Sequence, residues 1–301
     1  MSSPRSNGSG QRELDVAAVL EWAAGRRDDL PWRHTRDPWA VLVSELMLQQ
    51  TQVARVVDRY RLFLERFPNA PVCAAAGPGA VVEEWAGLGY NRRAVNLHRT
   101  AVIVTEQHGG SLPDDLAALL ALPGVGPYTA RAVLAFAFER DVAVLDTNVG
   151  RVLARQGGEP LSAGSAQRRA DDLVPVGAGW VWNQAMLDLG ALACTKRRPD
   201  CAGCPVSASC LWFASGCVEP DPATGSAGVS VPQSRFEGSF RQGRARLLDA
   251  LRTGAVIEPV EFAAICGWDS GQSGHDAAAA AESLVRDGLA VDVGGGSLRL
   301  P

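Results

Sequence analysis

Four of the chain's seven cysteines lie close together near residue 200, with the spacing Cys194-x6-Cys201-x2-Cys204-x5-Cys210. Four thiolates in one short loop suit either a structural zinc ion or a cubane iron–sulfur cluster, and the spacing alone does not separate the two. Unrelated buried cysteines are the alternative, which the Cys-x2-Cys core disfavours. The pattern therefore predicts a metal-binding loop, and the basic run 196–198 inside it suits a phosphate backbone.

Two acids stand in settings that could support chemistry. Eight of the ten residues from Trp39 to Leu48 are apolar, yet Glu45 lies among them. Burial without a partner is costly for a carboxylate and raises its pKa, so such a group serves either a reaction or a structural ion pair. Asp146 precedes a predicted helix and could simply cap it, but capping does not explain Asn148 two residues later.

Two glycine-containing turns could contact a nucleic acid. In LPGVGPYTARAVLAFAF, residues 122–138, Gly124 and Gly126 allow a tight turn before a new helix. The N–H groups of such a helix–hairpin–helix turn can bind one phosphate, although a plain corner between two helices is the alternative. In GLGYNRR, residues 87–93, Tyr90 is placed on a bend beside two arginines, as a base-stacking wedge requires. A buried tyrosine packed on its neighbours is equally compatible with that pattern.

Helical periodicity from about residue 14 to residue 213 must position these groups, so we expect an all-α fold. The predicted helices lie near 12–25, 38–50, 51–66, 79–85, 91–108, 114–121, 127–138, 148–156 and 180–190. Residues 218–234, rich in Pro, Gly and Ser, predict a linker. Residues 235–301 predict three helices and a β-hairpin, a winged-helix-like tail. Because its third helix carries two acids, Asp276 and Glu282, a packing or protein-contact role is favoured over DNA reading.

Composition excludes some classes of protein. Hydrophobic residues make up 47% of the chain and charged residues 21%, as in an ordinary globular protein. We expect no membrane association and a cytoplasmic location, because no apolar run approaches the roughly 18 residues of a membrane span and residues 1–10 predict a disordered polar leader. The net charge of −4 excludes a globally basic nucleic-acid binder but permits a locally basic groove.

These motifs occur together, in this order, in one family. The segment from about Leu30 to Cys210 resembles the adenine DNA glycosylases (MutY type) of the helix–hairpin–helix, iron–sulfur superfamily of base-excision repair enzymes. The matching stretches are LPWR at 30–33, SELMLQQTQV at 44–53, GLGY at 87–90, LPGVGPYTA at 122–130, LDTNV at 145–149 and NQAMLDLGALACT at 183–195, with the four-cysteine loop completing the set.

The resemblance implies a monomeric, monofunctional glycosylase that removes adenine mispaired with 8-oxoguanine or guanine from double-stranded DNA. It also implies a 4Fe-4S cluster on the four cysteines rather than zinc. The implied fold has two helical modules flanking a DNA cleft. Residues 30–140 form a six-helix module that contains the hairpin, and residues 11–29 join residues 141–217 in an iron–sulfur cluster module.

The resemblance also implies roles for individual residues. Glu45, kept protonated by apolar surroundings, would protonate adenine N7, while an ionised Asp146 stabilises the sugar cation and Asn148 orients that carboxylate. Tyr128 stands where related glycosylase/lyases carry a Schiff-base lysine, which predicts a monofunctional enzyme. The residues implied in DNA binding are the adenine-pocket residue Arg33, the stack-filling pair Gln50 and Tyr90, and the hairpin glycines Gly124 and Gly126.

Two departures from the family's pattern stand out. Asn91 replaces a second tyrosine after GLGY, which puts some lesion-side stacking in doubt. The tail is too short for the domain resembling nucleotide-pool hydrolases with which many members inspect 8-oxoguanine, so the preferred opposite base stays open. Two other readings remain. One is a thymine or uracil mismatch glycosylase, which generally lacks an acid at the position of Glu45; the other is a non-catalytic iron–sulfur DNA-binding regulator.

Overall fold

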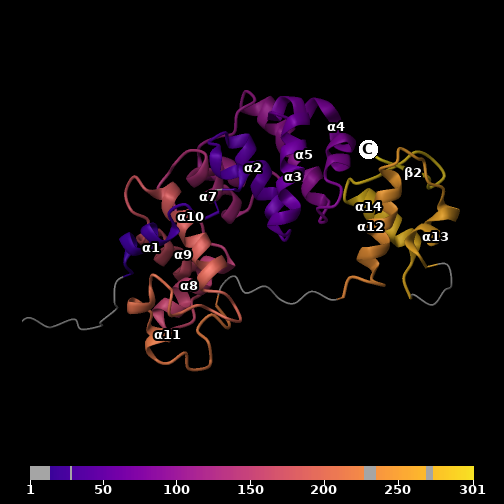
Figure 1. Cartoon of the computed structure of the whole chain (residues 1–301). Coiled ribbons are helices and arrows are strands. Elements are labelled where there is room, and N and C mark those ends of the chain that lie inside the picture. The colour runs from indigo at the N-terminus through magenta and orange to yellow at the C-terminus, as the bar shows by residue number, and fades with distance from the viewer. Residues whose placement is uncertain (1–13, 28, 227–234, 269–273) are drawn as a thin grey trace, which may run out of the picture. The chain divides into compact units, whose positions relative to one another are not determined.

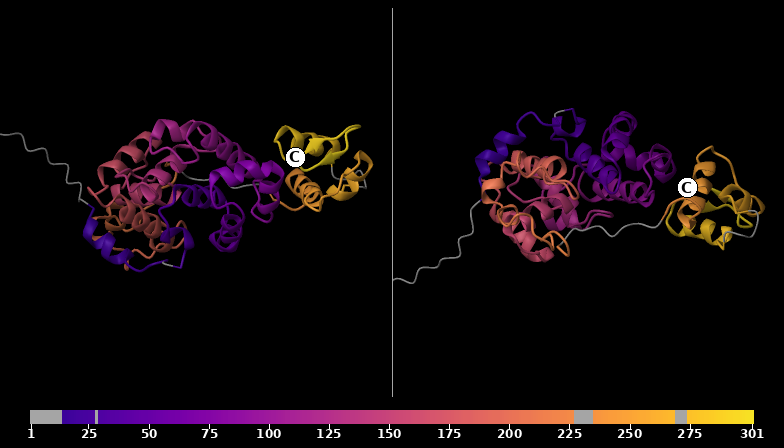
Figure 2. Two further views of the ribbon diagram at one scale, coloured as in Figure 1. Left: turned by 90° about the horizontal axis from the view of Figure 1, so that it is seen from above. Right: turned by 60° about the horizontal axis from the view of Figure 1, so that its bottom comes forward.

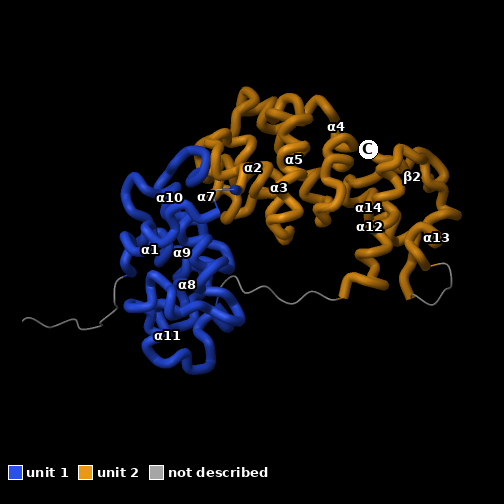
Figure 3. Tube along the Cα trace, in the orientation of Figure 1, with its two compact units in different colours: residues 1–29, 134–231 blue, residues 30–133, 232–301 orange. Residues whose placement is uncertain are grey.

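The structure, a computed structural model of the chain, describes residues 14–27, 29–226, 235–268 and 274–301. Two compact units make up the chain: unit 1 contains residues 1–29 and 134–231, and unit 2 contains residues 30–133 and 232–301 (Figure 3). The predicted all-α class is confirmed, because helices dominate both units and the described residues contain one two-stranded sheet (Figure 1). No helix in the described residues is long and apolar enough to cross a membrane. The predicted leader, residues 1–10, lies outside the described residues.

Residues 30–133 of unit 2 are helical almost throughout. Their elements are η1 (Pro31–His34), α2 (Pro38–Leu48), α3 (Val53–Arg66), α4 (Ala70–Glu84), α5 (Arg92–Gln107), α6 (Leu116–Leu120) and α7 (Pro127–Phe136), of which the last three residues belong to unit 1. Phe63 lies in the core of this unit, where its ring makes T-shaped contacts with Phe67 and Trp85 at centroid distances of 4.9 and 6.0 Å. Such aromatic contacts fix the packing of α3 against α4.

Helix α2 runs through the core of unit 2. Asp37 caps it by accepting the N–H of Trp39 at 3.0 Å, and Pro38 takes the first helical position, where a missing N–H is harmless. Every residue from Trp39 to Met47 is buried, which explains why the helix is apolar on all sides. The helix ends at Leu48, and the chain then turns through Gln50, whose φ is +55°.

Helix α4 starts at Ala70, whereas the sequence predicted a helix over 79–85 only. Two prolines and a glycine in this stretch look like helix breakers. Asn69 nevertheless caps the helix by accepting the N–H of Val72 at 3.0 Å, and Pro71 stands in the first turn, where proline is tolerated. Gly77, with φ +80° and ψ 161°, is not helical, so α4 consists of two helices that meet at a kink. The part of α4 after Gly77 corresponds to the helix that the sequence predicted over 79–85.

Unit 1 is built around α8 and α10. Its elements are α1 (Val16–Ala23), α8 (Thr147–Gly157), α9 (Ala163–Asp172), α10 (Gly179–Asp188), the π-helix η2 (Leu189–Ala193), η3 (Ser207–Ser209) and α11 (Leu211–Ala214). The sequence did not predict α9, because its buried face consists only of Ala166 and Ala170. Ser162 starts α9 by accepting the N–H of Ser165 at 3.2 Å.

The predicted linker, residues 218–234, is wrong in its first half. Asp221 forms an ion pair with Arg155 at 2.7 Å, and Ser226 accepts the N–H of Leu161 at 3.0 Å. Ala223 and Ser226 are both buried. Residues 218–226 therefore pack onto unit 1, while residues 227–234 lie outside the described residues.

The tail has the predicted three helices and hairpin. Its elements are α12 (Phe240–Leu251), the short turn η4 (Pro259–Glu261), α13 (Phe262–Cys266), α14 (Ala277–Arg286), β1 (Val291–Asp292) and β2 (Leu298–Arg299). The two strands are antiparallel, with Val291 opposite Arg299 and Asp292 opposite Leu298. An isolated bridge from Ile257 to Leu298 ties the hairpin to the loop after α12.

The tail docks on the helices of unit 2, beside α4 (Figure 2). Arg252, at the end of α12, donates from Nε to the carbonyl of Val82 at 3.1 Å and from Nη2 to Oδ1 of Asn91 at 2.8 Å. A Cβ on Gly79 would lie 2.3 Å from the carbonyl oxygen of Pro301, so the glycine permits close backbone contact. The tail is thus part of unit 2 and not a separate body.

Candidate functional site

Glu45 lies in the last two turns of α2 and is 6% exposed. Its neighbours along the helix are all buried, and the adjacent residues Ser44 and Leu46 are no more exposed than Glu45 itself. Burial disfavours the charged form of a carboxyl group, so this environment suits a proton donor. The local setting predicted for Glu45 is therefore present, while its role remains a proposal.

Asp146 caps helix α8, as the sequence predicted. Its Oδ1 accepts the backbone N–H groups of Asn148 at 2.8 Å and Val149 at 2.7 Å, and its Oδ2 accepts Nδ2–H of Asn148 at 2.8 Å. Burial raises the pKa of Asp146 above its ordinary value of 3.8, and the hydrogen bonds and the nearby Arg151 cation act in the opposite direction. These donors all favour the carboxylate form.

Asn148 is held in turn by Arg151. Nη2 of Arg151 donates to Oδ1 of Asn148 at 2.8 Å and to the carbonyl of Gly190 at 2.5 Å. Nε of the same guanidinium donates to the carbonyl of Cys194 at 2.6 Å. A continuous set of hydrogen bonds therefore joins the Asp146 carboxylate to the first cysteine of the cysteine loop, all within unit 1.

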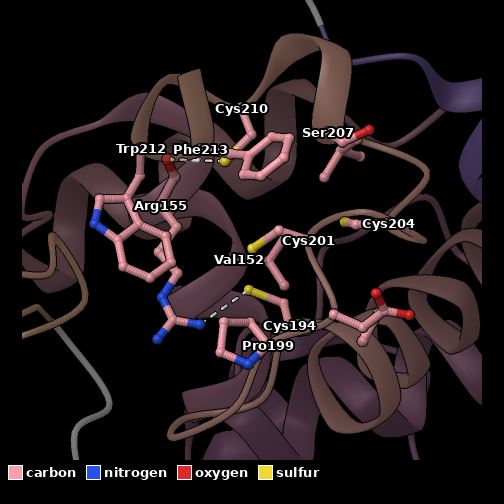
Figure 4. A pocket seen from close by; sticks show the side chains of 13 residues that line it. Val152, Arg155, Cys194, Pro199, Cys201, Cys204, Ser207, Cys210, Trp212 and Phe213 are labelled. Atoms are coloured by element: carbon pink, nitrogen blue, oxygen red, sulfur yellow. Dashed lines mark hydrogen bonds between the residues drawn. The ribbon is translucent and has the colours of Figure 1, made fainter. Parts of the chain in front are cut away.

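The four clustered cysteines line one pocket (Figure 4). Its other walls are mostly apolar and include Val152, Val206 and Phe213. No cysteine of the chain is in a disulfide. Within the described residues, no three His, Cys, Asp or Glu side chains are grouped as they would be around a bound metal ion. Four thiols facing one apolar pocket nevertheless form a donor set that fits a thiolate-bound metal centre.

Arg155 anchors the cysteine loop to α8 (Figure 4). Its guanidinium donates to Sγ of Cys194 at 3.5 Å and to the carbonyl of Thr195 at 2.8 Å. The charge is balanced by Asp221 at 2.7 Å, and the ring of Trp212 lies 4.4 Å from the guanidinium carbon. Sequence reasoning missed Arg155, because a lone arginine in a helix gives no sign that it is buried.

The predicted helix–hairpin–helix turn joins α6 to α7. Gly124 has φ +79°, and a Cβ there would lie 2.9 Å from Cβ of Asn96. Gly126 has open space where its Cβ would be, and its carbonyl accepts the N–H of Ala130 at 2.9 Å as α7 begins. The fold thus requires glycine at 124 but not at 126, so any need for Gly126 must come from a molecule that approaches the turn.

Gln50 and Tyr90 occupy two neighbouring turns of unit 2. Both have left-handed backbones, with φ of +55° and +46°, which is unusual and strained for residues with a side chain. Tyr90 is 42% exposed, and its ring lies 5.5 Å from the guanidinium carbon of Arg93. The role of Tyr90 as a wedge stays a prediction.

Arg93 joins these two turns. As the sequence predicted, it lies beside Tyr90 as a cation, with its guanidinium carbon 5.5 Å from the centre of the Tyr90 ring. Its burial, with only 8% of the residue exposed, was not predicted. Its guanidinium donates to the carbonyls of Leu46, Met47, Gln49, Leu88, Gly89 and Tyr90 and to Oγ1 of Thr51, at 2.6–3.3 Å. Burial lowers the pKa of Arg93 to about 10, so it is still charged at neutral pH. The end of α2 and the Tyr90 turn are held by one side chain.

The other predicted site residues also belong to unit 2. Arg33 lies in η1 beside Trp32, whose ring packs edge-on against Tyr60 at 5.6 Å. Tyr128 is half-buried in the first turn of α7, next to Thr129, whose hydroxyl accepts Nε2–H of Gln49 at 3.2 Å. Asp146, Asn148 and the cysteines belong to unit 1, and the remaining predicted residues to unit 2.

Comparison with known proteins defines the class. Residues 43–173 match the model of the HhH-GPD superfamily of base excision DNA repair proteins. The structure of a thermostable thymine-DNA glycosylase superposes on 66% of this chain and 95% of its own, with a TM-score of 0.62 and 31% sequence identity. The helical units and the hairpin therefore have the fold of a base-excision repair protein.

Two relatives narrow the class. The adenine DNA glycosylase of Mycolicibacterium smegmatis is 40% identical over 293 residues, which span 95% of this chain and 96% of the relative. That of Mycobacterium tuberculosis (strain CDC 1551 / Oshkosh) is 37% identical over 308 residues, spanning 99% of this chain and 97% of the relative. The chain belongs to the adenine DNA glycosylase family of the HhH-GPD superfamily. Because the second match spans nearly the whole chain, it includes the tail.

Proposed function

We propose that the protein is a monofunctional DNA glycosylase that removes adenine mispaired with guanine or 8-oxoguanine and so starts base-excision repair. The observation that carries this proposal is Glu45, a carboxyl group buried in a helix whose other residues are apolar except Ser44, in a chain whose near full-length relatives are adenine DNA glycosylases. A purine leaving group needs a proton on its ring, and a buried glutamic acid is suited to supply one. A pyrimidine leaving group has less need of such a donor.

In the proposed reaction, the adenine nucleotide is flipped out of the duplex, which costs a few kcal/mol. Glu45 donates its proton to adenine N7, and the N-glycosidic bond breaks with its electron pair going to the base. Asp146, as a carboxylate, stabilises the oxocarbenium ion that remains on the sugar until water adds to it. Asn148 keeps Oδ2 of Asp146 in a fixed orientation through its 2.8 Å hydrogen bond. Tyr128 offers no amine, so no Schiff base forms.

DNA binding is assigned to groups of unit 2. The turn containing Gly124 and Gly126 contacts a phosphate through its backbone, and Gln50 with Tyr90 fills the space that the adenine leaves. Arg33 lines the adenine pocket. Cys194, Cys201, Cys204 and Cys210 would hold a 4Fe-4S cluster, which would cross-link the two ends of the loop 194–210 and so give its basic residues a fixed conformation. The enzyme works as a monomer.

The test is a side-by-side glycosylase assay on four duplexes, with adenine opposite 8-oxoguanine, adenine opposite guanine, thymine opposite guanine and uracil opposite guanine. We expect base release from the first two only. In Glu45→Gln, release should fall by about 10²–10⁴-fold, the usual contribution of a general acid, with DNA binding retained. Glu65→Gln is the matched control, because Glu65 is exposed on α3. Its activity should equal that of the wild type.

Three results would contradict the proposal. Release of thymine or uracil but not adenine would assign the chain to pyrimidine mismatch repair. Full activity of Glu45→Gln would remove the proposed acid. Efficient borohydride trapping of a covalent protein–DNA adduct would show an amine nucleophile and exclude a monofunctional mechanism.

A further inference from the structure

The C-terminal end of α8 contacts the far end of the cysteine loop. Sγ of Cys210, the last of the four clustered cysteines, lies 3.4 Å from the carbonyl oxygen of Arg155 (Figure 4). The next residue of α8, Gln156, donates from Nε2 to the carbonyl of Ser209 at 3.2 Å. Arg155 also binds the first end of the loop through Cys194, so α8 holds both ends of the loop.

Gln156 is a buried amide whose two ends have different partners. The residue is 3% exposed, and its Oε1 accepts a hydrogen bond from Nη2 of Arg169, a residue of α9. A guanidinium can only donate hydrogen bonds and a carbonyl can only accept them, so these two partners allow the amide a single orientation. Arg169 therefore directs the Nε2–H group of Gln156 toward the carbonyl of Ser209.

Two glycines at the end of α8 permit these contacts. A Cβ on Gly157 would overlap Nη1 of Arg169, and a Cβ on Gly158 would lie 3.0 Å from Cβ of Leu211. Gly158 also has φ +73°, a left-handed conformation with which helices commonly end. The sequence RQGG, residues 155–158, therefore lets both the guanidinium from α9 and the end of the cysteine loop approach the helix closely.

The hydrogen bond from Gln156 fixes the peptide unit that precedes Cys210. The carbonyl of Ser209 and the N–H of Cys210 belong to this one planar unit. Gln156 donates to its carbonyl, and its N–H donates to the carbonyl of Ser207 at 3.3 Å. Both polar groups of the unit are therefore held. The orientation of this unit determines the direction in which the Cys210 side chain leaves the backbone.

We propose that Gln156 and Arg169 are positioning residues for the thiolate of Cys210 in the 4Fe-4S cluster. The inference rests on the proposed function, in which the four clustered cysteines hold that cluster. Gln156 acts through the backbone of Ser209, and Arg169 acts through Gln156. Residues that orient a metal ligand from outside the centre change metal affinity by about 10- to 100-fold when they are replaced.

The first test measures how fast the full-length, iron-loaded protein loses its cluster. Ferricyanide and EDTA are added, and the decay of the cluster's visible absorbance is followed. Gln156→Met keeps the length of the side chain but loses both hydrogen bonds, so we expect loss about 10-fold faster than in the wild type. Gln156→Glu still accepts from Arg169 but has no N–H for the Ser209 carbonyl, and it should match Gln156→Met. Arg169→Met should show a smaller increase, because Nε2–H of Gln156 remains.

Gln167→Met is the matched control. Gln167 is a half-buried glutamine of the same unit, and its Nε2 donates to the carbonyl of Ala143 at 3.3 Å, outside the cysteine loop. This variant should lose its cluster at the wild-type rate. Equal rates in Gln156→Met and the wild type, or equally fast loss in Gln167→Met, would overturn the inference.

The second test identifies the cysteine that is released first. Iodoacetamide is added with EDTA and without ferricyanide, and mass spectrometry of the digested protein measures alkylation at each cysteine. In Gln156→Met, Cys210 should be alkylated before Cys194, Cys201 and Cys204. Alkylation of all four at equal rates would indicate a general loosening of the unit and would refute a positioning role.

The outcomes for the inference and for the proposed function can be told apart. A wild-type protein that purifies without iron would refute the proposed cluster together with this inference. Iron-loaded variants that fail the two tests would refute this inference alone, because the cluster and the release of adenine are measured separately.

Discussion

Arg93→Met isolates the effect of one buried guanidinium on unit 2. The five N–H groups of the side chain lie within hydrogen-bond distance of seven acceptors, six backbone carbonyls and one hydroxyl, so some of them are shared between two acceptors. Methionine retains the apolar stem of the side chain but donates no hydrogen bond. The substitution therefore tests the polar contacts rather than the packing.

The size of the effect follows from the acceptors. Hydrogen bonds to a charged group contribute about 1.5–3 kcal/mol each, so five of them together would be comparable with the whole stability of a typical protein, about 5–15 kcal/mol. Acceptors near the surface can bind water once Arg93 is gone, and the buried carbonyl of Leu88 still accepts the hydroxyl of Thr51 at 3.1 Å. The carbonyls of Leu46 and Met47 are buried and have no such replacement. At about 1–1.5 kcal/mol for each unsatisfied carbonyl, we expect a loss of about 2–3 kcal/mol.

Arg92→Met is the matched control. Arg92 is the next residue in the chain, its side chain is 67% exposed, and its ion pair with Asp287 at 3.8 Å contributes about 0–1 kcal/mol. Scanning calorimetry should show unit 2 of Arg93→Met melting about 5–10 °C below the wild type, with Arg92→Met almost unchanged. Hydrogen exchange should rise in peptides 41–51 and 86–94. If Arg93→Met melts within about 2 °C of Arg92→Met, the guanidinium does not hold these turns.

Four further predictions concern the proposed site. Asn148→Ala removes a hydrogen bond that lowers the pKa of Asp146, so the acid limb of the kcat/KM profile should move to higher pH. Burial raises the pKa of Asp146 in the folded state above its ordinary value of 3.8. Protonation of Asp146 therefore stabilises the folded protein below pH 3.8, and this stabilisation is lost as the pH rises through the folded-state pKa. Asp146→Asn should remove this pH dependence of the unfolding free energy, measured by urea unfolding. Gly124→Ala should cost about 1–2 kcal/mol through its positive φ, whereas Gly126→Ala should fold normally and weaken DNA binding only if a phosphate approaches there. Arg155→Met should lower the iron content per purified chain, since it loses its contacts to the cysteine loop; unchanged iron would show that the loop folds without it.

The groups with local signals were predictable from the sequence. Asp146 caps α8 because an acid before a helix has nearby N–H groups to bind. Gly124 and Pro127 define the hairpin because glycine permits the positive φ of the turn, and proline fixes φ at the first position of α7. The cysteines share a pocket because their spacing is short. In each case the residues that decide the structure are within a few positions of one another.

Contacts between distant segments left no such signal. Arg93 lies 47 residues from Leu46, and nothing in its own neighbourhood distinguishes it from exposed Arg92. Arg155 finds its counter-ion 66 residues away at Asp221, inside a stretch whose composition predicted a linker. The proline and glycine content of a segment indicates how flexible its backbone can be. It does not indicate whether an acidic residue in that segment forms a buried ion pair.

Asn91 shows how such a distant contact changes the meaning of a substitution. Seen in the sequence, an asparagine in place of the family's second tyrosine predicts a loss of stacking beside the lesion. In the structure its side-chain oxygen accepts a hydrogen bond from Arg252, 161 residues away, and that bond fastens the tail next to Tyr90. A tyrosine hydroxyl would stand several ångströms further from the backbone and could not accept the same bond without moving the tail. Asn91→Tyr should therefore displace the tail from its place beside Tyr90, and hydrogen exchange of the amides in α12 should rise.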